Sequence, residues 1–494
     1  MTISLTSSSL TLYATILLYL ALMLGIGLWA NTANKRHAPG HSGFIEEYFL
    51  AGRKLGGFTL AMSIITTYTS ASSFIGGPGI AYTLGLGWVL LAMIQVPTTF
   101  LTLGIMGKRL SRFSRETGAI TISDFLRHRY KSRFLAVITS LFMLFFFVAI
   151  MLAQFIGGAR VLEVTTGAPY QLGLLFFAIT VIIYTTLGGF RAVVLTDLVQ
   201  GFIMFFAAII LLYGVTKAGG GVVNIMNTLT TIEPGLISPT GPNNAIPIPF
   251  MLSFWVLVGL GVLGLPQTAQ KCMAFTDEAS LRQAMVIGTV TIAFILLCTH
   301  LTGAFGRAVI PNLEAGDLIM PTLIVTLMPP VLAGLIIAGV LAAIMSTISS
   351  MLIMSSATII CDIYIEWRLR GEKQRVNQTF IRRISFGITA VLGIIVFCMA
   401  LSPPDLLVWI NLFAFGGLEA VFLWPVVLGL YWDKANTAGA LSAICIGVAL
   451  FLGLSITEAT PWRIHPIVPS LLFSGIAFVL VTLATQPKEA PLTS

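Results

Sequence analysis

Residues 339–364 read GVLAAIMSTISSMLIMSSATIICDIY, a stretch that is apolar enough to lie in a lipid bilayer yet rich in hydroxyl side chains. On a helix, four of its residues recur at spacings of three and four and therefore share one face: Ala343, Ser346, Thr347 and Ser350. Hard cations such as sodium take oxygen ligands, which hydroxyl groups and backbone carbonyls supply. Membrane helices also use serine and threonine for close packing and interhelical hydrogen bonds. The density of hydroxyl groups on one face favours a cation site over packing alone.

The composition of the chain requires lipid as its solvent. Of the 494 residues, 57% are hydrophobic and 9% are charged, whereas a soluble domain has about 25% charged residues. The first apolar run, 10–30, is too long for a signal peptide and has no lysine or arginine before it, so it is predicted to be a retained helix. The five cysteines are scattered, without a C-x-x-C pair, and no zinc, haem or iron–sulfur ligand set is evident. We therefore expect a multi-pass protein of the cell (inner) membrane.

Thirteen apolar runs are long enough to cross a bilayer, which takes about 20 residues. They are 10–30, 56–79, 84–107, 134–159, 170–187, 192–216, 247–270, 284–309, 328–362, 384–401, 406–431, 437–456 and 466–485. An odd number places the two termini on opposite sides. If the N-terminus is outside and the C-terminus inside, only four basic residues lie outside: Arg160, Lys217, Arg307 and Arg463. This asymmetry follows the positive-inside rule, so the basic loops indicate topology rather than binding of nucleic acid.

Two of the predicted spans contain residues that interrupt a helix. The second reads FTLAMSIITTYTSASSFIGGPG at 58–79, and the seventh reads GLGVLGLPQTAQ at 259–270. Hydroxyl, β-branched, glycine and proline residues weaken helices, and a pair of interrupted spans indicates a transporter site at mid-membrane. Because the two spans are five apart, we expect inverted five-span repeats over 56–216 and 247–431. The helix at 10–30 would then be an addition, and two peripheral helices would follow at 437–485.

Two acidic residues lie inside predicted spans. Asp197 occurs in LGGFRAVVLTDLVQGF and Glu419 in FAFGGLEAVFLWP. A carboxylate in the bilayer is costly unless it is paired or hydrated, which makes a functional role the first hypothesis. For Asp197 we favour a role in a cation path over pairing with Arg191. For Glu419 a hydrogen bond between helices is a sufficient explanation.

At these residues the chain resembles the sodium/solute symporter family. The resemblance covers nearly the whole chain and is carried by SASSFIGGPGIAY, QFIGGARVLE, GGFRAVVLTD, SFWVLVGLGVLGLPQTA, LAAIMSTISS and AFGGLEAVFLWPVVLGLYW. It implies a LeuT-type fold and a sodium site between the second and ninth spans. The implied ligands are the backbone carbonyls of Thr66, Thr69 and Ala343 and the hydroxyl groups of Ser346 and Thr347. Asp197 matches an acid that the family places near the ion exit path.

The resemblance also implies a hypothesis about a second sodium ion. In some relatives the position of Ser350, together with the equivalent of Asp197, forms a second site. Here such a site would comprise Asp197, Ser346, Ser349 and Ser350.

Within the family the resemblance is greatest to members that carry pantothenate, a monoanion with an amide, two hydroxyl groups and an apolar gem-dimethyl centre. Residues of the broken spans and of the facing third and fourth spans are expected to line its site: Ser70, Ser73, Gln95, Gln154 and Trp255. Gln95 and Gln154 have interhelical hydrogen bonding as an alternative role. Arg160 either meets the solute carboxylate or acts as an interfacial anchor.

Together these features predict a secondary transporter that couples inward sodium movement to solute uptake by alternating access. Another small carboxylate or amino acid, such as proline or sialic acid, is the alternative solute. An ion channel or membrane sensor is the alternative from another class, but no filter loop or signalling domain is evident. No nucleotide-binding loop, catalytic dyad or metal motif indicates an enzyme. Sodium is the expected co-transported ion, and no obligatory protein partner is evident.

Overall fold

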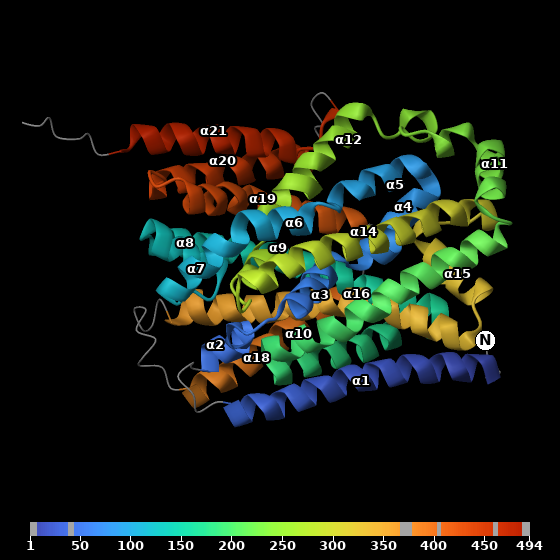
Figure 1. Ribbon diagram of the computed structural model, residues 1–494, viewed down its shortest axis with the longest axis horizontal. Helices are drawn as coiled ribbons and strands as arrows, with labels where there is room; N and C mark the ends of the chain where they lie inside the picture. Colours follow the sequence, from blue (N-terminus) through green and yellow to red (C-terminus); the bar gives the residue numbers. More distant parts are fainter. Residues whose placement is uncertain (1–6, 38–43, 366–377, 403–406, 458–462, 487–494) are drawn as a thin grey trace, which may run out of the picture.

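The computed structural model describes residues 7–37, 44–365, 378–402, 407–457 and 463–486, and these are almost entirely helical. Ten of the described helices are long and apolar enough to cross a membrane, and a further pair, bent by 49° at its break, would make an eleventh span. The long helices lie along the long axis of the molecule (Figure 1). The described part of the chain is therefore an all-helical membrane protein, as the composition predicts.

The helices fall into two groups along the chain. The first half forms α1 (Ser7–His37), α2 (Phe44–Leu50), α3 (Gly57–Tyr68), α4 (Gly77–Leu84), α5 (Leu86–Ala92), α6 (Thr98–Thr102), α7 (Lys108–Thr117), α8 (Ile122–Tyr130), α9 (Arg133–Thr166), α10 (Tyr170–Ala218) and α11 (Val222–Ile232). The second half forms α12 (Ile248–Phe254), α13 (Pro266–Cys272), α14 (Glu278–Val309), α15 (Ile319–Leu327), α16 (Pro330–Ala357), α18 (Gln378–Ala400), α19 (Leu407–Tyr431), α20 (Thr437–Ile456) and α21 (Ile467–Ala484). Short π and 3-10 turns interrupt or extend them, including η2 (Ser72–Gly76), η7 (Trp255–Leu260), η8 (Gly261–Gly264) and η10 (Thr358–Ile365).

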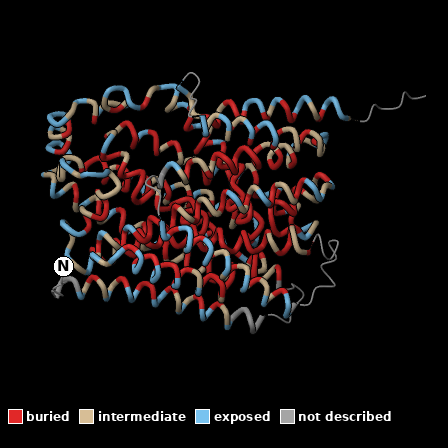
Figure 2. The backbone as a smooth tube through the Cα atoms, turned by 180° about the vertical axis from the view of Figure 1, so that it is seen from behind, coloured by how far each residue is buried: buried red, intermediate tan, exposed pale blue. Residues whose placement is uncertain are grey.

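Helix α16 lies at the centre of the bundle and α1 at its edge. In its most apolar window, the span formed by α16 and η10 is 83% buried, compared with 28% for the span of α1. α16 packs against α10, α1 and α9, and buried residues fill the middle of the molecule in Figure 2. The hydroxyl-rich stretch therefore faces other helices rather than lipid.

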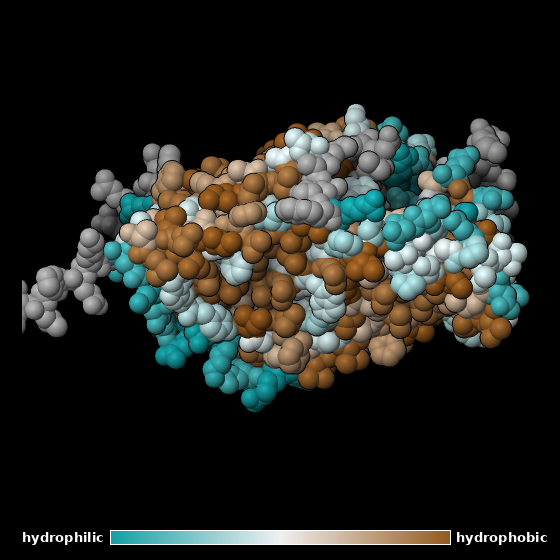
Figure 3. All heavy atoms as spheres, turned by 90° about the horizontal axis from the view of Figure 1, so that it is seen from above, coloured by the Kyte–Doolittle hydropathy of each residue, from teal (hydrophilic) through white to brown (hydrophobic). Residues whose placement is uncertain are grey.

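The outer surface of the bundle has the character of a lipid-facing surface. Large apolar side chains such as Leu17, Phe206 and Leu480 are exposed. In Figure 3 hydrophobic residues cover the middle of the molecule, and hydrophilic residues gather towards its two ends. An exposed apolar surface of this extent needs lipid around it.

Both predicted helix interruptions are present. The second predicted span is divided into α3, η2 and α4, and regular helix is lost between Tyr68 and Ser72. The seventh is divided into α12, η7, η8 and α13, with extended geometry at Leu265 before Pro266. The hydroxyl, glycine and proline residues quoted from the sequence lie at these breaks, because they offer the backbone alternatives to the helix.

Other details differ from the sequence prediction. The predicted spans 170–187 and 192–216 form one 49-residue element, α10, which is kinked at Gly189. The predicted span 84–107 is a series of short segments, in which Pro97 separates η3 from α6. Helices α11 and α15 were not predicted, because an apolar run shorter than a bilayer crossing does not meet the length criterion.

The kink in α10 depends on a glycine, which gives a stability prediction. Gly189 has φ 62° and ψ −159°, a conformation that essentially only glycine adopts at low cost. A Cβ atom there would lie 2.5 Å from Cδ2 of the Tyr48 ring. We expect Gly189→Ala to lower the free energy of unfolding by about 1–3 kcal/mol from backbone strain alone.

Thermal unfolding of the purified protein in detergent would measure this effect. Gly25→Ala is the matched control, because Gly25 lies in α1 and a Cβ there would have no atom within 4 Å. Alanine favours the helix at such a position, so the control should be neutral or slightly stabilising. Equal melting temperatures for Gly189→Ala and the wild type would contradict the role assigned to this kink.

Candidate functional site

The break in the second predicted span leaves backbone carbonyls available in the protein interior. Helix α3 ends at Tyr68, and Thr69 is extended with φ −80° and ψ 121°. The carbonyl groups of the last turn of a helix have no donors within that helix. Two carbonyls at this break, Thr66 O and Thr69 O, lie within hydrogen-bonding distance of hydroxyl groups of α16 instead.

Five oxygen atoms converge where this break meets α16. The Ser346 hydroxyl donates to Thr66 O at 2.9 Å and to Ala343 O at 3.0 Å. The Thr347 hydroxyl donates to Ala343 O at 3.0 Å and lies 3.4 Å from Thr69 O. All five residues are completely buried. The structure thus brings together the five oxygen atoms that were named from the sequence.

This set has the chemistry of a site for a small, hard cation. It consists of three carbonyl and two hydroxyl oxygens, the ligand type that such cations take. Each hydroxyl group can turn its proton away and present a lone pair to an ion. Because the ligands come from α3 with its broken end and from α16, a cation here would hold the two elements together.

Asp197 has a partner that the sequence did not indicate. Its Oδ2 accepts a hydrogen bond from Ser63 Oγ at 2.6 Å and lies 3.2 Å from Nζ of Lys271. Arg191, the partner considered from the sequence, pairs with Glu47 at 3.4 Å instead. The pairing of Asp197 with Arg191 is therefore wrong. Lys271 had been counted as a loop charge, but its side chain is only 1% exposed.

The two serines assigned to a second sodium site lie next to this ion pair. Ser350 Oγ is 3.4 Å from Thr67 Oγ1, and Ser349 Oγ donates to Ser346 O at 3.1 Å. Asp197 Oδ1 is buried and has no hydrogen-bond partner among the described residues. Hydroxyl groups therefore extend from the five-oxygen set towards Asp197.

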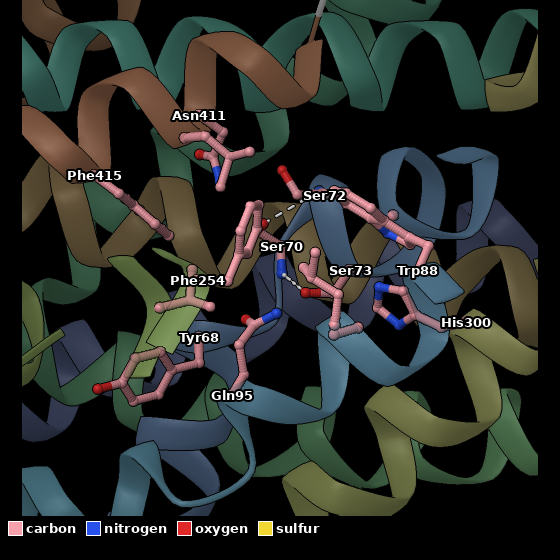
Figure 4. A pocket seen from close by; sticks show the side chains of 15 residues that line it. Tyr68, Ser70, Ser72, Ser73, Trp88, Gln95, Phe254, His300, Asn411 and Phe415 are labelled. Atoms are coloured by element: carbon pink, nitrogen blue, oxygen red, sulfur yellow. Dashed lines mark hydrogen bonds between the residues drawn. The ribbon is translucent and has the colours of Figure 1, made fainter. Parts of the chain in front are cut away.

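A small cavity of about 50 Å³ lies beside the same break (Figure 4). Three of the residues predicted to bind solute line it: Ser70, Ser73 and Gln95. Aromatic side chains, including Tyr68, Trp88, Phe254 and Phe415, form much of the remaining wall. The cavity thus combines an apolar wall with a few polar groups, which is typical of sites for small organic molecules.

The other two residues predicted to bind solute do not line this cavity. Gln154 is buried, and its Oε1 accepts a hydrogen bond from Ala71 N at 2.8 Å. It therefore holds the backbone between α3 and η2. Trp255 is 49% exposed, and its neighbour Phe254 faces the cavity instead.

Two polar residues of the cavity were not singled out from the sequence. Asn411 is contributed by α19 and His300 by α14, and both side chains point towards the cavity in Figure 4. His300 Nδ1 lies 2.8 Å from Leu296 O, so this nitrogen carries a proton. Its Nε2 is then free to accept a hydrogen bond from a solute in the neutral ring. The available sequence signal was a lone polar residue in each predicted span.

Arg160 lies in a separate pocket of about 240 Å³, with Glu163 and Asp317. It pairs with Glu163 at 2.9 Å, and its side chain is half exposed. Burial raises the pKa of the Asp317 carboxyl group to about 6. In this conformation Arg160 is an anchor at the pocket wall and does not reach the inner cavity.

Glu419 differs from its sequence interpretation. Both of its carboxylate oxygens are buried and have no hydrogen-bond partner among the described residues. The hydrogen bond between helices that was expected is therefore absent from the described structure. The carboxylate lies against Gly261 at the break of the seventh span, where a Cβ atom would come within 2.2 Å of Oε2.

Comparison with protein families decides the class of this molecule. The profile of the Sodium:solute symporter family matches residues 48–447. The chain belongs to this family. Its members are symporters, so the chain is a transporter and not an enzyme, and sodium is the co-transported ion.

Relatives within the sodium:solute symporter family match over almost the full chain. The sodium/pantothenate symporters of Haemophilus influenzae and Escherichia coli are each 48% identical, over 94% of this chain and 94% of their own length. The osmoregulated proline transporter OpuE of Bacillus subtilis is 29% identical over 90% of this chain and 91% of its own.

Solved structures show that the fold is shared with other transporters. A sodium-coupled sialic acid symporter in a substrate-bound, outward-open state superposes with a TM-score of 0.78 at 20% identity, over 97% of this chain and 99% of that one. The transporter MhsT in complex with L-phenylalanine matches with a TM-score of 0.53 at 13% identity, over 87% of this chain and 98% of that one. At these identities the likeness establishes the LeuT-like fold alone.

Proposed function

We propose that this protein takes up pantothenate together with sodium across the cell (inner) membrane by alternating access. The observation that carries the solute assignment is the 48% identity to two curated sodium/pantothenate symporters over 94% of the chain. Pantothenate has a carboxylate, an amide, two hydroxyl groups and an apolar centre. The mixed polar and aromatic wall of the inner cavity is compatible with these groups.

The sodium site of this proposal comprises the carbonyls of Thr66, Thr69 and Ala343 and the hydroxyls of Ser346 and Thr347. Its support is the convergence of these oxygens at the break of the second span. Thr69 is followed directly by Ser70, which lines the cavity. A sodium ion that orders this segment also orders the solute contacts, so sodium and solute raise each other's affinity.

The solute contacts of this proposal are Ser70, Ser73 and Gln95, with His300 and Asn411 as additions. Gln154 acts indirectly, through Ala71 N. Trp255 is left out in this conformation because it faces outwards. A cavity of about 50 Å³ is far smaller than pantothenate, so the walls must separate before the solute enters. Such an opening is part of alternating access.

The topology of the proposal has thirteen spans, with the N-terminus outside and the C-terminus inside. Each half of α10 about Gly189 would be a span, and the broken spans α3–α4 and α12–α13 would add two to the remaining long helices. Helix α1 begins at the end of the molecule where α11 lies, and α21 ends at the opposite end (Figure 1). Inverted repeats over 56–216 and 247–431, with additional helices at 10–30 and 437–485, complete this arrangement.

Uptake of labelled pantothenate into proteoliposomes containing only the purified protein tests the proposal. An inward sodium gradient should drive accumulation, and an equal potassium gradient should not. Unlabelled pantothenate should compete, whereas proline and sialic acid should not. Uptake without sodium dependence would overturn the coupling, and competition by proline alone would overturn the solute. Activity of the purified protein would also mean that no protein partner is obligatory.

Gln95→Ala is expected to raise the pantothenate concentration for half-maximal uptake by roughly two- to tenfold. The side chain lines the cavity, and one hydrogen bond is worth about 0.5–1.5 kcal/mol. The sodium requirement should change little, because Gln95 contributes no oxygen to the proposed sodium site. Gln171→Ala is the control, since Gln171 is an exposed glutamine. Uptake kinetics at saturating sodium would check this, and an unchanged half-maximal concentration would remove Gln95 from the solute site.

A further inference from the structure

An ammonium group lies in the oxygen cluster around Asp197. Lys271 is in the last turn of α13, directly after the break of the seventh span. Its Nζ donates to Ser63 O at 2.5 Å and to Ser63 Oγ at 2.7 Å, and also to the Thr67 hydroxyl group. With Asp197 Oδ2 at 3.2 Å, four oxygen atoms contact this ammonium. All of these residues are buried.

These oxygens form a cage that would suit a sodium ion. They comprise a carboxylate, two hydroxyl groups and a carbonyl, all of which are ligands for hard cations. The cage is joined to the proposed sodium site through Thr67 Oγ1, which lies 3.4 Å from Ser350 Oγ of α16. One carboxylate balances one positive charge, and two cations in contact inside a protein repel each other strongly. The cage therefore holds either an ammonium or a sodium ion, but not both.

We infer that Lys271 is a tethered cation that takes the place of a second co-transported sodium ion beside Asp197. This inference rests on the proposed function. Because the lysine stays with the protein through the cycle, each solute is accompanied by one sodium ion. A monoanion and one sodium together carry no net charge, so uptake does not respond to the membrane potential.

Lys271→Ala should convert the cage into a sodium site. The shortened side chain leaves a space bounded by Ser63, Thr67 and Asp197, whose Oδ1 is also unpaired among the described residues. The Hill coefficient for sodium in pantothenate uptake should rise from about one towards two, since a second ion then binds cooperatively with the solute. Movement of one net charge should increase steady-state accumulation up to roughly 50-fold at an inside-negative potential of about 100 mV.

Binding of radioactive sodium to the purified proteins in detergent measures the same change without transport. We expect about one sodium per wild-type protein and about two per Lys271→Ala protein. Asp197→Asn combined with Lys271→Ala should return to one, because the carboxylate that attracts the second ion is gone. Lys108→Ala is the matched control, since Lys108 is an exposed lysine and should leave the count at one.

These outcomes separate the inference from the proposed function. Wild-type uptake that is driven by membrane potential, or two sodium ions bound to the wild type, would overturn the inference while leaving sodium coupling intact. One sodium bound to Lys271→Ala would also overturn it. Pantothenate uptake that ignores sodium would overturn the proposed function, and the sodium count in the absence of pantothenate would still decide the role of Lys271.

Discussion

Ser346→Ala is expected to raise the sodium concentration for half-maximal pantothenate uptake by roughly ten- to a hundredfold. The Ser346 hydroxyl contacts a carbonyl from each side of the proposed site, Thr66 O and Ala343 O. A hydrogen bond or ligand interaction with a charged group is worth about 1.5–3 kcal/mol, and each 1.4 kcal/mol is about tenfold in affinity. Thr347→Ala removes the corresponding contact with Ala343 and Thr69, and should have a comparable effect.

A sodium titration of uptake at saturating pantothenate measures this change. Ser355→Ala is a closely matched control, because Ser355 is also a buried serine of α16 but its hydroxyl has no hydrogen-bond partner among the described residues. It should leave the sodium requirement unchanged. Thr347→Ser keeps the hydroxyl group and should remain close to wild type. Full activity of both alanine variants at low sodium would refute the five-oxygen site.

The five-oxygen site could be located from the sequence because its geometry is local. Within α16, helical spacing alone places Ala343, Ser346 and Thr347 on one face. The hydroxyl and glycine content of the second span predicted a break, and the break frees the carbonyls that complete the set. Family resemblance supplied the register between the two elements, which spacing within either element does not contain.

Lys271 was placed wrongly because charge counting assumes that basic residues near a span end lie in water. The seventh span bends by 49° before its last turn, at a break that the glycines and Pro266 create. The bend aims the end of α13 back into the protein, where Ser63 and Asp197 receive the lysine. The presence of a break is readable from composition, but the direction of the segment after it depends on packing between distant elements.

The face presented by an irregular helix is equally difficult to predict. Phe254 lines the cavity whereas Trp255 is exposed, and the change to π geometry begins at Trp255. Regular 3.6-residue spacing no longer relates positions before and after such a change. His300 and Asn411 were missed for another reason: each is a single polar residue on an apolar span, and only the fold reveals that both face one cavity.

Replacing Lys271 by methionine is expected to destabilise the protein by about 3–5 kcal/mol when sodium is absent. The substitution removes one partner of a fully buried ion pair and leaves the Asp197 carboxylate uncompensated, which costs about that much in proteins. The oxygens of Ser63 and the Thr67 hydroxyl also lose a donor. Methionine has nearly the length of lysine, so lost packing volume contributes little.

The double variant Asp197→Asn/Lys271→Met should regain most of the lost stability. With both charges removed, the interior contains polar groups but no unpaired ion, and such replacements of buried pairs are often neutral. Thermal unfolding in detergent, in a sodium-free buffer, would compare the two variants. Lys108→Met is the control, because its pair with Glu278 is exposed on both sides and is worth about 0–1 kcal/mol. If the double variant were less stable than Lys271→Met, the hydrogen bonds of Asp197 rather than its charge would govern the stability of this cluster.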